Sequence, residues 1–300
     1  MIGADPHTGS VIERMRLVAA AAENPPLPVE DVWLTGPLAL GLAHALSDVD
    51  IVMVTATGAH AVESDVRDGI RVDYAVASRK EIDEDRAYLA DFDVTYDDIE
   101  SFRRVRGRMR ALTRLATAVD ARRDGTPVLA GPELRVYQSW LLADQVEDVH
   151  SLTEDLVGLI TDDLLDSAGI VWAALLQRLR FVVLAAAGAP LLGAKWLPQL
   201  SARYADCSAV DRLAAAVAAD GIVSVREHFP AVQTIVFEAL AAGQRAAATA
   251  AEGSPAPTGF GWLPQVYADG WFVRLGEERR RLTPGQVLGW QEAIKEKTRG

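Results

Sequence analysis

The chain has 300 residues, of which 50% are hydrophobic, and its formal net charge at pH 7 is −12. This length and composition suffice for a sizeable buried core and predict one large or two modest domains. The acidic balance argues against nucleic acid as a partner, because proteins that bind phosphate backbones usually carry a basic stripe.

The N-terminal residues 1–24 predict an amphipathic helix, because charged residues such as Glu13 and Arg14 surround an apolar stripe. A secretory signal would show an uninterrupted apolar segment instead. The proline-rich residues 24–28 end this helix and form an extended connector. The single cysteine, Cys207, excludes an internal disulfide and fits a reducing compartment, so we expect a cytoplasmic protein.

Residues 32–55 predict a buried strand, a tight turn at Gly36 and Pro37, a short helix to about residue 46, and a second strand that begins with Asp48 and Asp50. Side chains alternate along a strand, so the two carboxylates share one face. Like charges at this separation repel each other unless a cation compensates them. Mg²⁺ binds carboxylate and phosphate oxygens, and the pattern therefore predicts a magnesium site.

A third acid follows on a later strand. A turn at residues 67–69 precedes a β-type segment, residues 70–76, in which Asp73 stands where a core residue is expected. If this strand lies beside the second, three carboxylates meet and hold two metal ions that clamp a phosphoryl group. The alternative is a solvated strand end. An arginine from the protein itself in that corner, or an Asp73 side chain turned away, would contradict the metal site.

This order of strand, glycine turn, helix, Asp-x-Asp strand and third aspartate resembles the DNA polymerase β-like nucleotidyltransferase superfamily. The resemblance is to the bacterial branch that includes aminoglycoside and lincosamide nucleotidyltransferases, and it covers residues 32–76, with a weaker echo at residues 193–197. It implies that Asp48, Asp50 and Asp73 bind two Mg²⁺ and that a nucleoside triphosphate lies against Gly36. An acceptor hydroxyl would then attack the α-phosphate.

The chain departs from that pattern at two positions. Pro37 stands where the family usually has a serine, and Leu40 where many bacterial members have an arginine, so two donors to the triphosphate are missing. The first amides of the following helix, from Leu38 and Ala39, remain as anion donors. The resemblance also implies that Lys195 faces the triphosphate; the alternative is a surface lysine lying over the neighbouring tryptophan.

Further elements complete the first domain, which we expect to span residues 1–124. Ser78 predicts an N-cap for a helix over residues 79–89, and a second helix is expected over residues 99–123 after an exposed acidic segment. The second helix is dense in arginine. These arginines meet a nucleotide's phosphates or form a solvated face paired with the preceding acids: Arg103, Arg104, Arg106, Arg108, Arg110 and Arg114.

The second domain, residues 125–252, is predicted to be an all-α bundle, since no strands alternate with its helices. Its helices are expected over residues 132–149, 152–166, 170–187, 209–219 and 223–251. The most apolar run, residues 170–190, is interrupted by Arg178 and Arg180. Its uninterrupted pieces are too short to span a bilayer, so we interpret it as a core helix and expect no membrane contact.

Several side chains are weaker candidates for a general base or for attracting a cationic acceptor, the alternative being exposed or packed helix residues. They are Asp144, Glu147, Asp148 and His150, then Asp162, Asp163 and Asp166, and finally His44. Residues 253–300 are expected to form a linker, an aromatic segment that packs on the bundle or covers the acceptor site, and a helix that starts at Thr283 and Pro284.

The sequence therefore predicts an α+β protein, with a mixed-sheet nucleotidyltransferase-like domain followed by a helical bundle. The expected reaction is Mg²⁺-dependent transfer of a nucleoside monophosphate, by default from ATP, to a hydroxyl of a small molecule such as an amino sugar or antibiotic. Two alternatives stay open. One is a toxin-type enzyme that modifies protein or tRNA, and the other is a catalytically decayed nucleotide-binding or regulatory protein. The sequence does not indicate the oligomeric state.

Overall fold

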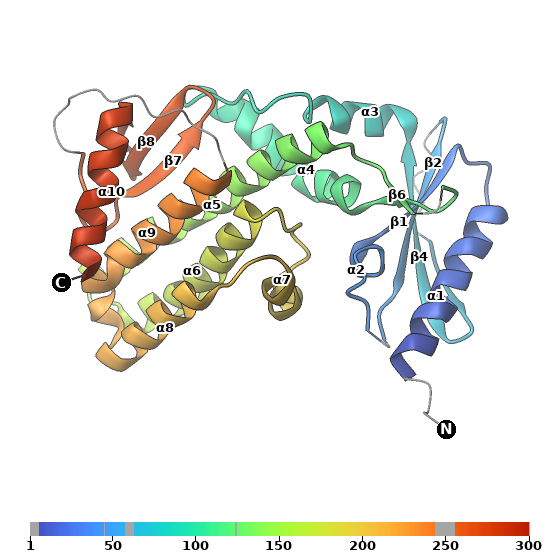
Figure 1. Ribbon diagram of the computed structural model, residues 1–300, viewed down its shortest axis with the longest axis horizontal. Coiled ribbons are helices and arrows are strands. Elements are labelled where there is room, and N and C mark those ends of the chain that lie inside the picture. Colours follow the sequence, from blue (N-terminus) through green and yellow to red (C-terminus); the bar gives the residue numbers. More distant parts are fainter. Residues whose placement is uncertain (1–5, 45, 58–62, 124, 244–255, 300) are drawn as a thin grey trace. The chain divides into compact units, whose positions relative to one another are not determined.

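The structure is a computed structural model that describes residues 6–44, 46–57, 63–123, 125–243 and 256–299. It confirms the α+β class: a mixed six-stranded sheet with helices is followed by a helical region, α5 to α9, and a three-stranded sheet (Figure 1). The chain forms two compact units. Unit 1 comprises Met1–Asp91 and Gly107–Tyr137, and unit 2 comprises Phe92–Arg106 and Gln138–Gly300.

The sheet of unit 1 has the strand order β3-β4-β2-β1-β5-β6. Strands β2 and β4 are parallel, and every other neighbouring pair is antiparallel. The strands are β1 (Asp31–Thr35), β2 (Val49–Thr55), β3 (Glu63–Arg67), β4 (Ile70–Ser78), β5 (Val119–Asp120) and β6 (Thr126–Pro127).

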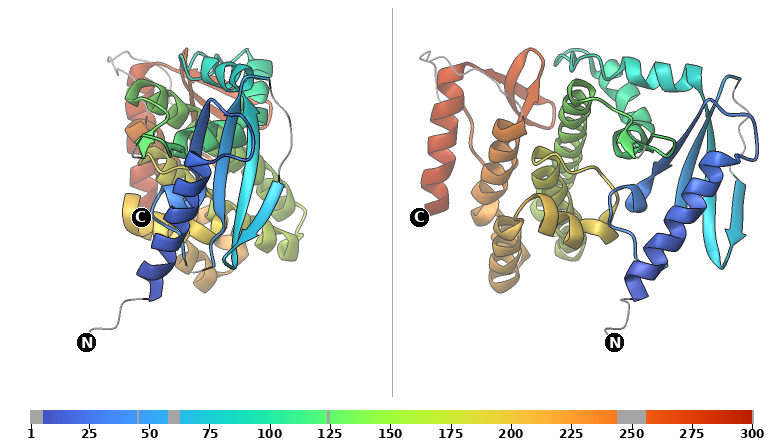
Figure 2. Two further views of the ribbon diagram at one scale, coloured as in Figure 1. Left: turned by 90° about the vertical axis from the view of Figure 1, so that its right-hand side faces the viewer. Right: turned by 45° about the vertical axis from the view of Figure 1, so that its right-hand side comes forward.

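One face of this sheet forms the core of unit 1 against helix α1 (Pro6–Glu23), which runs along the sheet (Figure 2). Alternate residues of the central strands point to this face, and they pack with Val18, Ala21 and Ala22 of the helix. The sheet residues in this cluster are Val32, Leu34, Val49, Ile51, Met53, Ile70, Val72 and Tyr74. The opposite face carries Asp50 and Asp73, because both alternate with core residues.

The segment before β2 differs from the prediction. The helix after the glycine turn, α2 (Gly36–Ala39), is a single turn and does not reach residue 46. Gly41 follows it with φ +66°, a conformation that does not continue a helix. The remaining segment is held from α1, where the buried Arg14 donates through Nε to the Ser47 carbonyl at 2.8 Å.

The hairpin of β3 and β4 confirms the turn at residues 67–69 but adds a strand that the sequence did not predict. Asp68 and Gly69 both have positive φ, at 52° and 76°, as a two-residue hairpin turn requires. Strand β3 was missed because Glu63–Arg67 is charged and shows no apolar alternation, which is typical of a sheet edge.

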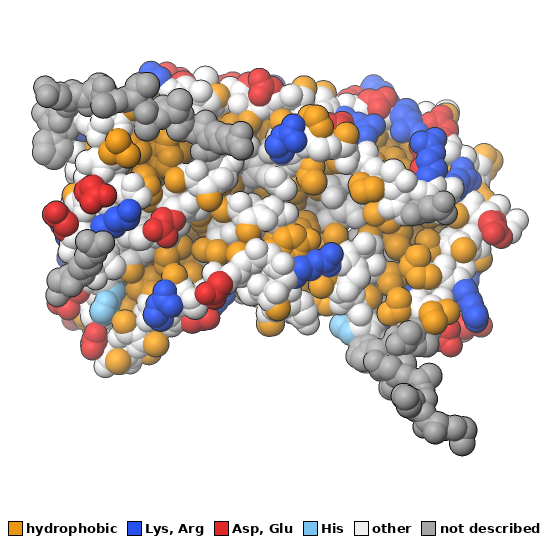
Figure 3. All heavy atoms as spheres, in the orientation of Figure 1, with side chains coloured by type: hydrophobic (Ala, Val, Ile, Leu, Met, Phe, Trp, Pro, Cys, Tyr) orange, Lys and Arg blue, Asp and Glu red, His pale blue; other side chains and the backbone are white. Residues whose placement is uncertain are grey.

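Helix α3 (Arg79–Ala87) begins with the predicted cap: Ser78 Oγ accepts from the Glu81 amide, and Glu81 accepts from the Ser78 amide. Side chains of both charge signs gather over α3, as its sequence RKEIDEDRA requires (Figure 3). Helix α4 (Ile99–Thr117) ends earlier than predicted, because the residues that follow it form β5 and β6.

Unit 2 contains the helical region, in which several boundaries were predicted wrongly. The helix expected from residue 170 begins at residue 165, and residues 244–251 of the helix expected over residues 223–251 lie outside the described residues. Residues 132–149 and 152–166 were expected as two helices, but α5 (Gly131–Thr161) is continuous across them, and its first residues belong to unit 1. The other helices are α6 (Leu165–Ala186), α7 (Leu197–Tyr204), α8 (Ser208–Asp220), α9 (Val225–Gly243) and α10 (Pro284–Arg299), with short 3₁₀ turns at Ala194–Trp196 and Ile222–Ser224. Helix α7 was not predicted.

The aromatic segment near the C-terminus is a three-stranded antiparallel sheet that packs on the helical region, as one of the two alternatives predicted, and its role as a cover of the acceptor site stays a prediction. Strands β7 (Leu263–Tyr267), β8 (Gly270–Leu275) and β9 (Glu278–Leu282) follow in that order. Trp271 packs against Phe237 of α9, with ring centroids 5.1 Å apart. The predicted start of α10 is confirmed, since the Thr283 amide donates to Gln286 Oε1 at 2.9 Å. Residues 252–255 of the predicted linker lie outside the described residues.

Helix α6 is the one helix of the described chain long and apolar enough to cross a bilayer by length and composition. Within unit 2 it buries eight residues, among them Trp172, Leu179 and Phe181. A core helix satisfies the same criteria of length and composition, which makes this weak evidence for a membrane span.

The domain boundary predicted after residue 124 lies within unit 1.

Candidate functional site

The sheet register brings two of the three predicted aspartates side by side. In the parallel pair of β2 and β4, Asp50 lies opposite Asp73. The same row continues to Thr35 on β1 and to Ser64 on β3. All four side chains share one face, because directly opposed residues in a sheet point the same way. The polar row therefore runs across four strands, at the end of β1 and near the start of β2.

Asp48 lies next to this row, two residues before Asp50. It immediately precedes β2 and is exposed. Continued by one pair, the β2–β4 register places it beside Arg71, which shares a face with Asp73 because the two are separated by one residue on β4. Three acidic side chains and one arginine thus gather at this corner of unit 1.

The Asp73 carboxylate already accepts two hydrogen bonds from the protein. Its Oδ1 accepts from Ser64 Oγ at 2.6 Å and from Arg71 Nε at 2.8 Å. Partial burial acts to raise the pKa of Asp73, but the hydrogen bonds from Ser64 and Arg71 outweigh it, and the pKa lies below the usual range. Asp73 is therefore ionised at neutral pH.

Arg71 acts on all three acids. Its pKa is raised, first by the hydrogen bond and charge of Asp73 and then by the charges of Asp48 and Asp50. The condition that would contradict a metal site is thus met in part, since an arginine from the protein compensates the predicted ligands. Among the described residues, no group of three or more His, Cys, Asp or Glu side chains is arranged to hold a metal ion. The Asp48, Asp50 and Asp73 oxygens nevertheless match Mg²⁺ in chemical kind.

Gly36 lies directly against this corner. It has φ +70°, and a Cβ built on it would stand 2.3 Å from Asp50 Oδ2 and 3.1 Å from Asp50 Cγ. Only glycine satisfies both the left-handed backbone and the close approach. The turn after β1 and the Asp50 carboxylate are therefore fitted to each other. Binding of a triphosphate by Gly36, Pro37 and Leu38 at the start of α2 stays a prediction.

A comparison of two glycines tests this fit. Gly36→Ala and Gly41→Ala both place alanine at positive φ, but the Gly41 Cβ would meet no atom within 4 Å. We expect Gly36→Ala to lower the free energy of unfolding by about 2 kcal/mol more than Gly41→Ala, because overpacking adds to the shared backbone strain. Urea unfolding of both variants measures the difference. Equal losses would show that the contact with Asp50 carries no energy.

The arginines of α4 are exposed except for Arg106, which is half-buried, and two of them pair with preceding acids, as the alternative of a solvated face predicted. Arg103 pairs with Glu100 at 2.7 Å, and Arg108 pairs with the buried Asp85 at 2.7 Å. Burial raises the pKa of Asp85, and Arg108 counteracts this rise. Arg106 belongs to the buried network of unit 2, whereas Arg114 interacts electrostatically with Asp50.

Lys195 and His44 are both exposed. The Lys195 ammonium lies over the Trp196 ring, 5.4 Å from its centroid, as the surface alternative described, and its role towards a triphosphate stays a prediction. His44 was expected on a helix, but it lies after α2. Its Nδ1 accepts from the Leu46 amide at 3.1 Å. It therefore stabilises the segment that leads to Asp48.

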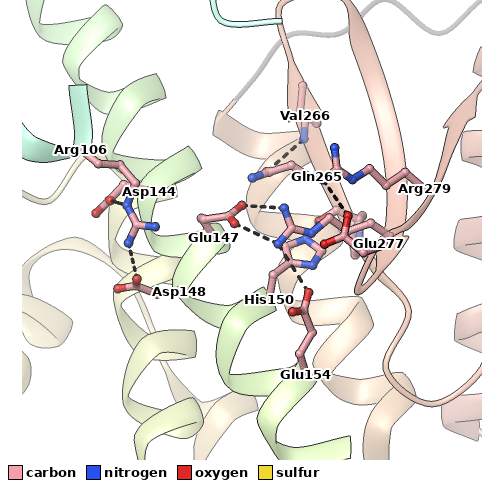
Figure 4. Close-up of polar contacts among 12 residues, drawn as sticks. Arg106, Asp144, Glu147, Asp148, His150, Glu154, Gln265, Val266, Glu277 and Arg279 are labelled. Atoms are coloured by element: carbon pink, nitrogen blue, oxygen red, sulfur yellow. Dashed lines mark hydrogen bonds and ion pairs between the residues drawn. The ribbon is translucent and has the colours of Figure 1, made fainter. Parts of the chain in front are cut away.

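The acids of α5 that were candidates for a general base are instead tied into ion pairs (Figure 4). Asp144 and Asp148 bind Arg106 at 2.7 and 2.6 Å, and Arg178 also approaches Asp148 at 3.3 Å. Desolvation raises the pKa of Asp144, which Arg106 opposes.

Glu147 and His150 face the C-terminal sheet. Glu147 forms a two-pronged pair with Arg274, with both N–O distances 2.9 Å. His150 is buried, and desolvation, followed by the charge of Arg274, lowers its pKa well below the ordinary value. The neutral imidazole donates through Nε2 to the Pro264 carbonyl at 3.3 Å. Glu147 and His150 are thus held by contacts within unit 2. Asp162, Asp163 and Asp166 lie exposed at the junction of α5 and α6, and their role as candidate bases stays a prediction.

Arg71 is the site residue that the sequence prediction missed. Its signal was present, since Arg71 and Asp73 are separated by one residue on a predicted strand and must share a face. The contact between Gly36 and Asp50 had no such signal, because it depends on the register of β1 and β2.

A scan against protein-family models and a search of curated proteins both find no match for this chain.

Proposed function

We propose that this protein is a Mg²⁺-dependent nucleotidyltransferase of the DNA polymerase β-like type that acts on a small molecule in the cytoplasm. The observation that carries the proposal is the pairing of Asp50 with Asp73 on parallel strands, with Gly36 against the Asp50 carboxylate. Strand, glycine turn, Asp-x-Asp strand and third aspartate thus meet at one corner of unit 1.

Bound Mg²⁺ would neutralise the triphosphate and fix the acceptor oxygen in line with the α-phosphate. The residues of the chain set up that chemistry. Asp48 and Asp50 would hold both ions, and Asp73 would hold the ion nearer the acceptor and take up its proton. Gly36 lets the turn after β1 approach the Asp50 carboxylate closely. A hydroxyl of the acceptor forms the new bond to the α-phosphorus, and pyrophosphate departs.

Arg71 is compatible with this role as a counterion that metal replaces. Its side chain is 56% exposed, and its pair with Asp73 lies at the surface. Exposed ion pairs contribute little to stability, whereas a dication gathers three carboxylates at once. The guanidinium can therefore move into solvent when metal binds.

An Arg71→Gln variant tests that competition. We expect it to bind Mn²⁺, used in place of Mg²⁺, about tenfold more tightly than the wild type, because a competing charge beside the ligands is removed. Electron paramagnetic resonance of free Mn²⁺ gives the affinity. Arg67→Gln is the matched control, since the Arg67 side chain is 41% exposed and pairs with Asp65 on β3. Unchanged or weaker binding by Arg71→Gln would contradict the competition.

A regulatory nucleotide-binding protein without turnover is the second candidate, and the position of Arg71 among the acids favours it. Incubation with Mg²⁺, α-labelled ATP and a pool of hydroxylated small molecules separates the two. Transfer of label to a small molecule, with release of pyrophosphate, supports the enzyme. Binding of ATP without pyrophosphate release in any pool would contradict the enzyme and support the second candidate.

A further inference from the structure

The side chains of two arginines of α4 form neither an ion pair nor a hydrogen bond among the described residues, although the chain carries 42 acidic and 30 basic side chains. They are Arg110 and Arg114, and both are exposed. The other arginines of the helix have polar partners at short distances: Arg103 with Glu100, Arg104 with Ser101, Arg106 with Asp144 and Asp148, and Arg108 with Asp85. The exception calls for an explanation, because acids are in excess.

Helical geometry places the two guanidinium groups together. Arg110 and Arg114 are four residues apart, which makes them neighbours on one face, and like charges at this spacing destabilise a helix. Arg114 keeps solvent access, yet partial desolvation and then the charge of Arg110 lower its pKa, while Asp50 and Asp85 act in the opposite direction. The pair thus concentrates positive charge within electrostatic reach of the acidic corner.

The helix leaves space beside the pair. Gly107 precedes Arg110 by three residues and Arg114 by seven, so all three share one face of α4. A Cβ at Gly107 would meet no atom within 4 Å, so close packing does not require glycine there. Glycine inside a helix costs about 1 kcal/mol relative to alanine. The helix surface at Gly107 carries no side chain, so an extended anion can lie there beside the guanidinium groups of Arg110 and Arg114.

We propose that Arg110 and Arg114 form a binding site for a polyphosphate chain, such as the β- and γ-phosphates of a nucleoside triphosphate. Arginine presents forked N–H donors that match phosphate oxygens. The two side chains would supply the donors that Pro37 and Leu40 do not offer beside Gly36. That the bound polyphosphate belongs to a nucleotide rests on the proposed function. Binding of a polyphosphate anion does not.

The simpler alternative is that Arg114 only neutralises Asp50. In that case removal of Arg114 would weaken the fold and leave anion binding unchanged. This alternative does not explain Arg110. The charge of Arg110 repels that of Arg114, and Arg110 forms no ion pair with an acid among the described residues.

The experiment measures binding of inorganic triphosphate by calorimetry at low salt without metal, for the wild type, Arg110→Gln, Arg114→Gln and the double variant. We expect each single change to weaken binding about tenfold, as loss of a hydrogen bond to a charged group does, and the double change to abolish it. Arg103→Gln is the matched control: it removes the same charge from an exposed face of the same helix. It should bind as the wild type does.

Equal affinity in the wild type and the double variant would overturn the site, as would no detectable binding by the wild type. Pyrophosphate release from MgATP by the wild type is measured in parallel. If the wild type releases pyrophosphate and the variants bind triphosphate as tightly as the wild type does, the enzyme proposal is kept and the proposed role of these arginines is refuted. Arginine-dependent binding without release in any acceptor pool would keep the anion site and refute the enzyme.

Discussion

Replacing Asp50 with asparagine should reduce nucleotidyl transfer at least about a thousandfold while leaving the fold intact, because several kcal/mol of metal-based charge stabilisation would be lost. Asparagine keeps the shape of the side chain, so the contact with Gly36 and the register with Asp73 are preserved. It removes the negative charge from the residue expected to hold both ions. Pyrophosphate release from MgATP with an acceptor measures the loss.

Asp65→Asn is the matched control for Asp50→Asn. Asp65 lies on β3 in the same unit, is exposed and bonds Arg67 at 2.8 Å. The same charge is removed there without touching the acidic corner, so activity should stay at the wild-type level. An Asp50→Asn variant that retains wild-type turnover would refute the assignment, and a matching loss in Asp65→Asn would show that net charge matters instead of the site.

The central strands and the caps of unit 1 could be predicted because their signals are local. The apolar run of β2, the Asp68–Gly69 turn and the Ser78 capping box each lie within a few residues. Strand β3 could not be predicted, since its Glu-Ser-Asp-Val-Arg sequence has no apolar face and is fixed only by its hydrogen bonds to β4. Periodicity detects a strand only when one face is buried.

The pairing of acids with arginines was beyond local patterns for a different reason. Glu147 and Arg274 are 127 residues apart, so nothing along the chain links them. Sequence alone therefore suggested the α5 acids as chemical groups, whereas the structure shows them neutralised. Asp50 and Asp73 are neighbours, as the sequence predicted for adjacent strands, because both lie on strands that the pattern could recognise. The guanidinium of Arg71 beside them was not weighed.

Arg274→Met should lower the free energy of unfolding by about 3 kcal/mol or more, the second large effect that we expect. The Arg274 and Glu147 side chains are only 11% and 15% exposed, and Glu154 approaches the same guanidinium at 3.6 Å. Without the arginine, two carboxylates remain beside the buried, neutral His150 with no cation to compensate them. Chemical denaturation followed by tryptophan fluorescence measures the loss.

A second substitution identifies the source of that loss. If the cost comes from the uncompensated charge of Glu147, then Arg274→Met combined with Glu147→Leu should recover most of the stability, because an apolar pair can replace a buried ion pair at little net cost. Arg279→Met, opposite Arg274 on β9, is the control and should cost no more than about 1 kcal/mol, since Arg279 is exposed and lies over Tyr96. A double variant no more stable than Arg274→Met would mean that the arginine stabilises unit 2 through packing of its stem, and that charge compensation is secondary.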